Sequence, residues 1–205
     1  MKNFKNFIKV CKTQNIRLVK KKLSIQTFSN VSIRIDRKYF TIKPSGVLPS
    51  KINERDCPII RIIDGKKVKG KYNPSTDTPT HQILYKTFDQ LKSISHTHSK
   101  YATAWAQTGK SIPIYGTTHA DYWSGKVPVT GYLNKKQLNQ YEKNTGYLIV
   151  KLLKKLKVNT KNCPGVIVAG HGPFCWGNDY DSAVNYSEML EFISEIAYYS
   201  EQIKV

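Results

Sequence analysis

The sequence predicts an α/β fold in which helices pack on a mixed or largely antiparallel sheet. Strand-like segments occur as hairpins, whose strands pair antiparallel, and segments with apolar residues at helical spacing lie between them. No Gly-x-Gly-x-x-Gly or Walker-type loop occurs, so no nucleotide cofactor is indicated. The 205 residues are expected to form one domain, residues 1–205, with a substantial apolar core.

The N-terminal half predicts a helix, two hairpins and a second helix. Apolar side chains at helical spacing near the start favour an amphipathic helix. Strands at residues 24–35 and 39–42 then flank a short polar turn. A second hairpin, 58–63 with 66–70, turns over Asp-Gly, a favoured two-residue loop. Thr78, followed by proline, is typical of a helix N-cap and opens the next helix.

The C-terminal half predicts two strands and three helices around a loop-rich region. The strands rest on β-type apolar patterns and the helices on apolar residues three and four apart. In order, the segments are a strand at 94–99, a helix at 101–107, loops at 109–131, a helix at 145–157, a strand at 166–169 and a helix at 181–202.

The composition predicts a folded, soluble, cytoplasmic protein. Hydrophobic residues make up 40% and aromatic residues 11%, which argues against disorder. No apolar run approaches the roughly 20 residues of a membrane span, and the first residues lack a signal peptide's apolar stretch. The four cysteines have no Cys-x-x-Cys spacing, so reduced thiols are expected rather than disulfides or a zinc ribbon.

The formal net charge of +19 suggests nucleic-acid binding, but the kind and spread of the basic residues argue against it. Lysine supplies 28 of the 33 basic residues, whereas base readout and bidentate phosphate contacts favour arginine. The lysine cluster at 151–157 lies on the polar face of an amphipathic helix. We expect no nucleic-acid or membrane partner, and a mild attraction for phosphorylated small substrates.

The pair His96 and His98, in Ser-His-Thr-His-Ser, is the first sign of chemistry. In a strand, side chains two residues apart point to the same face, so both imidazoles would project together. Two imidazoles aimed at one point suit a divalent cation such as zinc. A polar surface strand without a metal can carry the same pair, so the pair alone leaves both interpretations open.

Two further residues could complete a metal site. His171 leaves a predicted buried strand between two glycines, where its side chain can reach a cleft, and Asp77 could add a carboxylate oxygen. Three histidines, one carboxylate and an open position are typical of a catalytic divalent-metal site. The alternatives are a turn or cap role for Asp77 and a core role for His171. For His81, on a predicted helix, we expect a structural role.

Five stretches of the sequence resemble the class II aldolase and epimerase family. They are residues 42–47, 74–81, 96–107, 116–122 and 171–177. The stretches follow the family's order, and such a colinear set is far more specific than any single motif. The resemblance implies a three-layer α/β/α fold with a central, largely antiparallel mixed sheet. It also implies a homotetramer with active sites between subunits.

The resemblance further implies a divalent metal, usually Zn²⁺, held by His96, His98 and His171 with Asp77 as a further ligand. The family's phosphate-sugar aldolases typically carry glutamate at the position of Asp77, so the aspartate resembles the 4-epimerase branch. Those enzymes interconvert L-ribulose 5-phosphate and D-xylulose 5-phosphate. Since the inverted carbon has no acidic proton, they break the C3–C4 bond by a retro-aldol step and re-form it on the other face of the aldehyde. The metal stabilises the enediolate.

Six substrate contacts are implied by the resemblance, and they fall in three pairs of consecutive residues. They are Ser29, Asn30, Ser45, Gly46, Ser75 and Thr76. Their hydroxyls and amides could cradle the phosphate of a ketopentose, and Lys43 could add charge or belong to a solvated turn. The family has glycine at the position of Ser29, so this side chain could bond the phosphate or crowd it.

The retro-aldol route needs acid/base groups on both faces of the aldehyde. Asp121 matches the family position for one of them, although alone it could be a loop carboxylate. The family's second group is a tyrosine in a tail beyond the last helix, and nothing after Ile203 resembles that tail. We therefore expect a 4-epimerase with an incomplete proton-transfer set. A class II phosphate-sugar aldolase and a catalytically impaired paralogue serving as a subunit are the alternatives.

Overall fold

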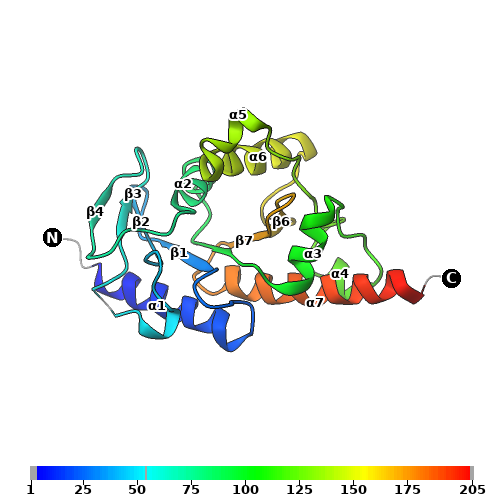
Figure 1. Cartoon of the computed structure of the whole chain (residues 1–205), viewed down its shortest axis with the longest axis horizontal. Coiled ribbons are helices and arrows are strands. Elements are labelled where there is room, and N and C mark those ends of the chain that lie inside the picture. Colours follow the sequence, from blue (N-terminus) through cyan, green and yellow to red (C-terminus); the bar gives the residue numbers. More distant parts are fainter. Residues whose placement is uncertain (1–3, 54, 204–205) are drawn as a thin grey trace.

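A computed structural model describes residues 4–53 and 55–203 and is built on a seven-stranded sheet (Figure 1). The described residues exclude 1–3 and Val205. Residues 1–3 belong to the N-terminal stretch in which no signal peptide is expected. The strand order is β4-β3-β2-β1-β5-β7-β6, and every neighbouring pair is antiparallel. The strands are β1 Asn30–Arg34, β2 Tyr39–Ile42, β3 Ile59–Arg61, β4 Lys67–Lys69, β5 Ser93–His96, β6 Gly165–Ile167 and β7 Pro173–Gly177.

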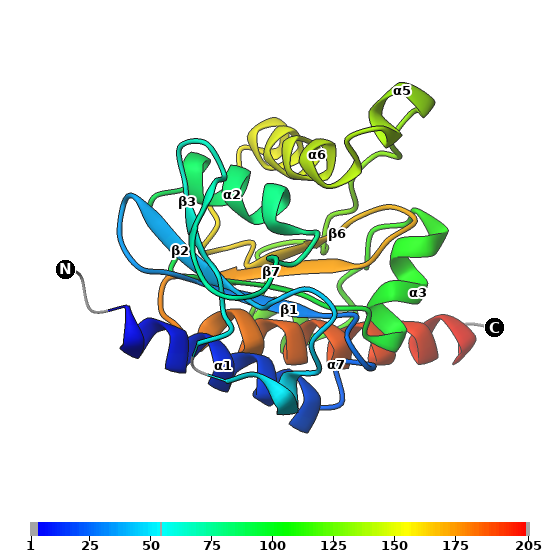
Figure 2. The ribbon, with the colours of Figure 1, turned by 60° about the vertical axis from the view of Figure 1, so that its left-hand side comes forward.

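Helices cover both faces of the sheet (Figure 2). The α-helices are α1 Lys5–Lys20, α2 Thr78–Thr87, α3 Lys100–Thr108, α4 Thr117–Ala120, α5 Lys135–Leu138, α6 Tyr141–Leu156 and α7 Ser182–Ile203, with a short 3₁₀ helix, η1, at Pro49–Lys51. α1 and α7 pack on one face, and α2 and α6 lie over the other. A single bridge between Val129 and Ile167 is parallel. The predicted three-layer α/β/α fold with a largely antiparallel mixed sheet is confirmed.

The apolar core has two parts, and α7 contributes side chains to both. The larger part includes Leu84 and Tyr85 of α2, Ile149 of α6, and Ile94 and Phe174 of the central strands. The smaller part joins side chains of α1 to β1 and β3. Burial of these side chains is the main force that holds the helices on the sheet, at about 25 cal/mol per Å² of apolar surface.

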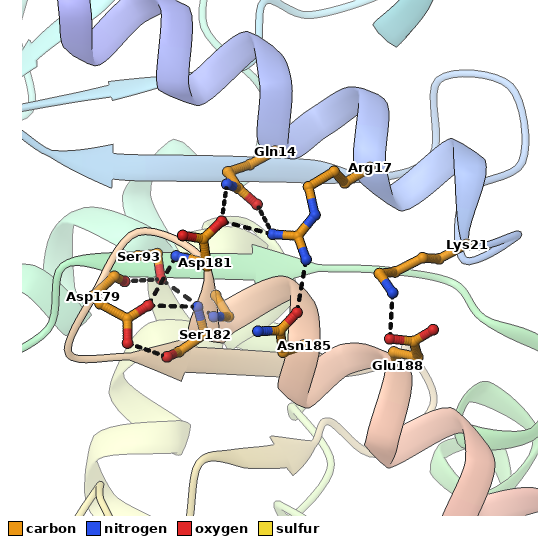
Figure 3. A network of polar contacts seen from close by, with 10 residues as sticks. Gln14, Arg17, Lys21, Ser93, Asp179, Asp181, Ser182, Asn185 and Glu188 are labelled. Carbon is orange, nitrogen blue, oxygen red and sulfur yellow. Dashed lines mark hydrogen bonds and ion pairs between the residues drawn. The ribbon is translucent and has the colours of Figure 1, made fainter.

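Polar contacts fix how α1 lies along α7 (Figure 3). The Arg17 guanidinium donates to Asp181 at 2.8 Å and to Asn185 at 2.7 Å, and Lys21 pairs with Glu188 at 2.5 Å. These side chains are partly solvated, so each pair contributes about 0.2–1 kcal/mol. The network joins α1 to the N-terminal part of α7, beside the apolar cluster that the two helices share.

Several predicted boundaries are corrected by the structure. The strand expected at 24–35 begins at Asn30, because the chain turns before it, with Gln26 at a φ of 53°. The strand expected at 94–99 ends at His96, and the helix expected from 145 begins at Tyr141. β7 was not predicted as a strand, because its alternation is hidden by a run in which every residue is buried.

Two predictions about composition can be compared with the fold. Among the described residues, no helix is both long enough and apolar enough to cross a membrane. The four cysteines, Cys11, Cys57, Cys163 and Cys175, are free and buried, as expected for reduced core thiols.

Candidate metal and substrate site

The candidate site lies at one end of the central strands β1, β5 and β7. β1 begins at Asn30, β5 ends at His96, and the two residues are direct partners across the sheet. His96 is also the partner of Phe174 near the start of β7. Side chains of directly opposed residues project to the same face, so Asn30, His96 and Phe174 form one row. This face is the one covered by α2, whose His81 and Tyr85 contact Ser32 of β1.

Three histidines from different segments converge at this row. His96 ends β5, His98 lies in the loop that follows, and His171 lies in the turn between β6 and β7. A potential ligand atom of each lies within 4.8 Å of those of the other two, and the Nε2 atoms of His96 and His98 are 3.0 Å apart. The predicted grouping of the histidines therefore holds, even though His98 lies beyond the strand.

Hydrogen bonding and burial favour the neutral form of these histidines, which can bind a divalent cation. The Nδ1 of His96 donates to the carbonyl oxygen of Pro173 at 2.9 Å, which leaves Nε2 with its lone pair toward the site. Burial, followed by the nearby histidines, lowers the pKa of His96 and that of His171 to about 3. Burial also lowers the pKa of His98. Neutral imidazoles at neutral pH are the form that ligates divalent metals.

Asp77 lies beside the histidine cluster and lines the same cavity. It occupies the N-cap position of α2, one residue before the Thr78 expected from the sequence, but its carboxylate makes no capping bond within the described chain. Instead, Oδ2 accepts a hydrogen bond from Nδ2 of Asn30 at 2.7 Å. The carboxylate is thus directed into the cavity. A neutral donor set of three imidazoles with one carboxylate nearby suits a divalent cation.

A cavity of about 340 Å³ contains the histidines, Asp77 and all six predicted substrate contacts. Its lining residues are Thr27, Phe28, Ser29, Asn30, Lys43, Ser45, Gly46, Ser75, Thr76, Asp77, His96, His98, Tyr141, Glu142 and His171. Sequence reasoning missed Thr27, Phe28, Tyr141 and Glu142 as site residues. The first two were assigned to a strand, and the last two fell before the predicted start of their helix. No spacing signal marks any of the four.

The loops at the cavity are braced against one another. The amide of Ser75 donates to the carbonyl of Lys43 at 3.0 Å, and the amide of Ser45 donates to Asn73 at 2.9 Å. Those two amides are therefore occupied, and the hydroxyl groups are what the serines offer to a ligand. The Ser29 hydroxyl donates to Ser24, and Ser29 still lines the cavity.

Lys43 places a buried positive charge in the cavity wall. Only 2% of its surface is exposed, and its ammonium donates to the carbonyls of Thr27 and Pro44, both at 3.3 Å. Burial lowers the pKa of Lys43, while the Asp77 carboxylate acts to raise it. Lys43 is therefore part of the cavity rather than of a solvated turn. A further polar atom, the buried Oδ1 of Asn30, has no hydrogen-bond partner and is ready to accept one from a ligand hydroxyl.

Asp121 lies in a different place. It is the exposed C-cap residue of α4 and lines a second hollow of about 320 Å³. That hollow is lined by Ala120, Asp121, Tyr122, Ser124, Lys161, Asn162 and Tyr186, and it shares no lining residue with the histidine cavity. Its neighbour His119 donates from Nε2 to the carbonyl of Gly125 at 2.9 Å, which braces the loop that carries Asp121. The fold of one chain does not bring Asp121 to the histidines.

His81 remains in the core beneath the site. It is fully buried, its Nδ1 lies 2.7 Å from Oγ of Ser32, and burial lowers its pKa to about 3. It lines neither hollow.

Comparisons with known proteins agree with this arrangement. Residues 9–198 match the Class II Aldolase and Adducin N-terminal domain family. The chain is 42% identical to L-ribulose-5-phosphate 4-epimerase UlaF of Salmonella paratyphi B and of Salmonella typhi, over 86% of this chain and 77% of each relative. Among solved structures, an L-fuculose 1-phosphate aldolase superposes with a TM-score of 0.81 at 24% identity, covering 98% of this chain and 88% of that one. A sugar-phosphate aldolase from Thermotoga maritima gives 0.77 at 16% identity, covering 98% and 97%.

The two structural likenesses establish the fold, and the family match spans nearly the whole chain, including every residue of the histidine cavity. The family is dependent on divalent metals, and the three-histidine cluster is the place where this chain could hold one. This protein belongs to the class II aldolase family.

Proposed function

We propose that this protein is a Zn²⁺-dependent sugar-phosphate 4-epimerase that interconverts L-ribulose 5-phosphate and D-xylulose 5-phosphate by breaking and re-forming the C3–C4 bond. The proposal rests on one observation: a single cavity contains three neutral histidines, Asp77 and the polar loops whose serines could bind a phosphate. The relatives at 42% identity bear the name of this activity.

The chain's own residues divide the work by the chemistry of their side chains. The hydroxyls of Ser45 and Ser75 and the ammonium of Lys43 suit a phosphate, since they supply donors and positive charge. The Asn30 amide holds the Asp77 carboxylate in place, and its unpartnered Oδ1 suits a sugar hydroxyl, because a phosphate dianion has no proton to donate.

A metal bound at His96, His98 and His171 would act as a Lewis acid that stabilises negative charge on the sugar oxygens. The residues around the metal site hold the aldehyde fragment that the bond cleavage produces. When the C3–C4 bond breaks, the phosphate stays with the two-carbon aldehyde. Loops that hold the phosphate therefore prevent its escape while the carbonyl turns over.

Proton transfer at the C4 oxygen is assigned to Asp121 of a neighbouring copy. Within one chain this carboxylate is exposed and lines a separate hollow, so it serves a site only if a second copy brings it to the histidine cavity. An oligomer, which we propose to be a homotetramer, would satisfy this requirement because each copy donates Asp121 and accepts one.

The proposal is tested with the purified full chain. Metal content is measured first, and conversion of L-ribulose 5-phosphate is followed by detecting D-xylulose 5-phosphate. An aldehyde trap is run in parallel. Epimer formation without trapped aldehyde is expected. Release of the two-carbon aldehyde phosphate would identify an aldolase instead, and tight metal binding without any turnover would identify a paralogue that only binds.

A further inference from the structure

The three histidines of the cluster are held in place in different ways. The ring of His96 has two anchors, the hydrogen bond from Nδ1 to Pro173 and a parallel stack on Phe174, with centroids 4.2 Å apart and planes at 16°. His171 lacks the first kind of anchor, because its Nδ1 is buried without a hydrogen-bond partner. Metal-ligating histidines are usually oriented by a hydrogen bond from the second ring nitrogen. Something else must therefore orient the ring of His171.

The backbone of the turn is held by hydrogen bonds, including one from the His171 amide to the carbonyl of Val168 at 2.9 Å, but these bonds leave the ring free to rotate about its side-chain torsions. The residue lies in the turn between β6 and β7, flanked by Gly170, with a φ of 71°, and Gly172. Besides the other two histidines of the cluster, whose ring centroids lie 4.5 and 5.0 Å from that of His171, two rings pack against it and can orient it. Phe174 packs edge-on against His171 with the ring centroids 6.1 Å apart. Tyr141 also packs edge-on, with the centroids 5.4 Å apart and the ring planes at 66°.

Tyr141 is well placed to act as a fixed wall. It is the first residue of α6, it is half-buried, and it lines the histidine cavity. The start of α6 is tied to α2 by the Thr80 hydroxyl, which donates to the carbonyl of Glu142 at 2.5 Å. One turn further, Gly146 lets the helices approach so closely that an added Cβ would lie 3.0 Å from Ile83. α2 in turn carries Asp77 at its N-terminus.

We propose that Tyr141 is a positioning residue for the cavity, and that the edge-on contact of its ring sets the orientation of His171 for metal binding. This inference rests on the proposed metal site. It gives the unpredicted start of α6 a role: the helix begins four residues earlier than expected and thereby brings an aromatic ring to the histidine that lacks a hydrogen-bonded anchor. The aromatic ring, not the phenol hydroxyl, is the part that acts.

The test measures Co²⁺ binding and the visible absorption spectrum of the Co²⁺ protein in three variants of the full chain. Tyr141→Leu removes the ring, and we expect its Co²⁺ affinity to fall about 10-fold, with an altered spectrum, within the range typical of lost ligand support. Tyr141→Phe keeps the ring and should restore wild-type affinity and spectrum within about twofold. Tyr147→Leu, an exposed position on the same helix, is the matched control and should leave both unchanged.

The outcomes separate the inference from the proposed function, since Co²⁺ binding needs no turnover. Wild-type Co²⁺ affinity and spectrum in Tyr141→Leu would overturn the inference. Equal losses in Tyr141→Phe and Tyr141→Leu would also overturn it, because they would assign the effect to the hydroxyl. A protein that shows the expected series but has no epimerase activity would keep the inference and refute the function.

Discussion

The histidine cavity and the hollow at Asp121 are similar in volume, about 340 and 320 Å³, but they are built differently. The cavity includes buried polar groups, among them Lys43 and an Asn30 oxygen without a partner. Burying such groups costs free energy unless a ligand compensates. The Asp121 carboxylate, by contrast, is exposed at the end of a four-residue helix. One chain therefore supplies the buried polar groups of the cavity, whereas Asp121 lies exposed at a separate hollow, as our proposal of a site shared between copies requires.

The largest effect is expected from His96→Asn, which removes the most rigidly held of the three histidines. The variant should lose stoichiometric metal and at least about 10³-fold of the epimerase activity, because Lewis-acid stabilisation is the main term at such a site. Metal analysis and the epimer assay measure this on the same preparation. A metal-free wild-type protein that behaves like the variant would refute the metalloenzyme interpretation.

Asp121→Asn should sharpen the contrast, because it changes the second hollow alone. We expect activity to fall about 10²–10⁴-fold, the usual contribution of a positioned acid or base, while metal content stays at the wild-type level. Unchanged turnover would mean that Asp121 is an ordinary loop carboxylate.

Mixing the two inactive variants tests whether the hollows meet between copies. If Asp121 serves a neighbouring copy's cavity, refolded or co-expressed mixtures of His96→Asn and Asp121→Asn should regain up to about a quarter of wild-type activity, since about one site in four pairs an intact cavity with an intact Asp121. No recovery in mixtures shown to share subunits would place the whole reaction within one chain.

The smallest effect is expected outside both hollows. Arg17→Ala breaks the contacts of α1 with Asp181 and Asn185, which are partly solvated. The free energy of unfolding should fall by no more than about 1 kcal/mol, with activity within twofold of wild type. Denaturant unfolding and the epimer assay provide the two measurements. A large loss of activity would connect this network to the site, against the present assignment.

The sequence by itself determined the fold class and most of the cavity. Hairpin and helix patterns predicted helices packed on a largely antiparallel sheet, and the family resemblance added the three layers. The colinear motifs singled out Asp77, the three histidines and the six expected substrate contacts, all of which line one cavity. These residues could be grouped from the sequence because short motifs fix local chemistry, and because the family's order of motifs indicates which of them meet. β7 was not predicted as a strand, because strands buried along their whole length lose the alternation that marks a half-exposed strand.

Tertiary structure alone decided three matters. It brought Tyr141 against His171, a contact between residues 30 positions apart that no periodicity encodes. It buried Lys43, which the sequence left open between a charged ligand contact and a solvated turn. It also separated Asp121 from the histidines. The physical reason is common to all three: distances across a packed sheet and its helices depend on how whole elements stack, whereas a motif records only which residues are neighbours along the chain.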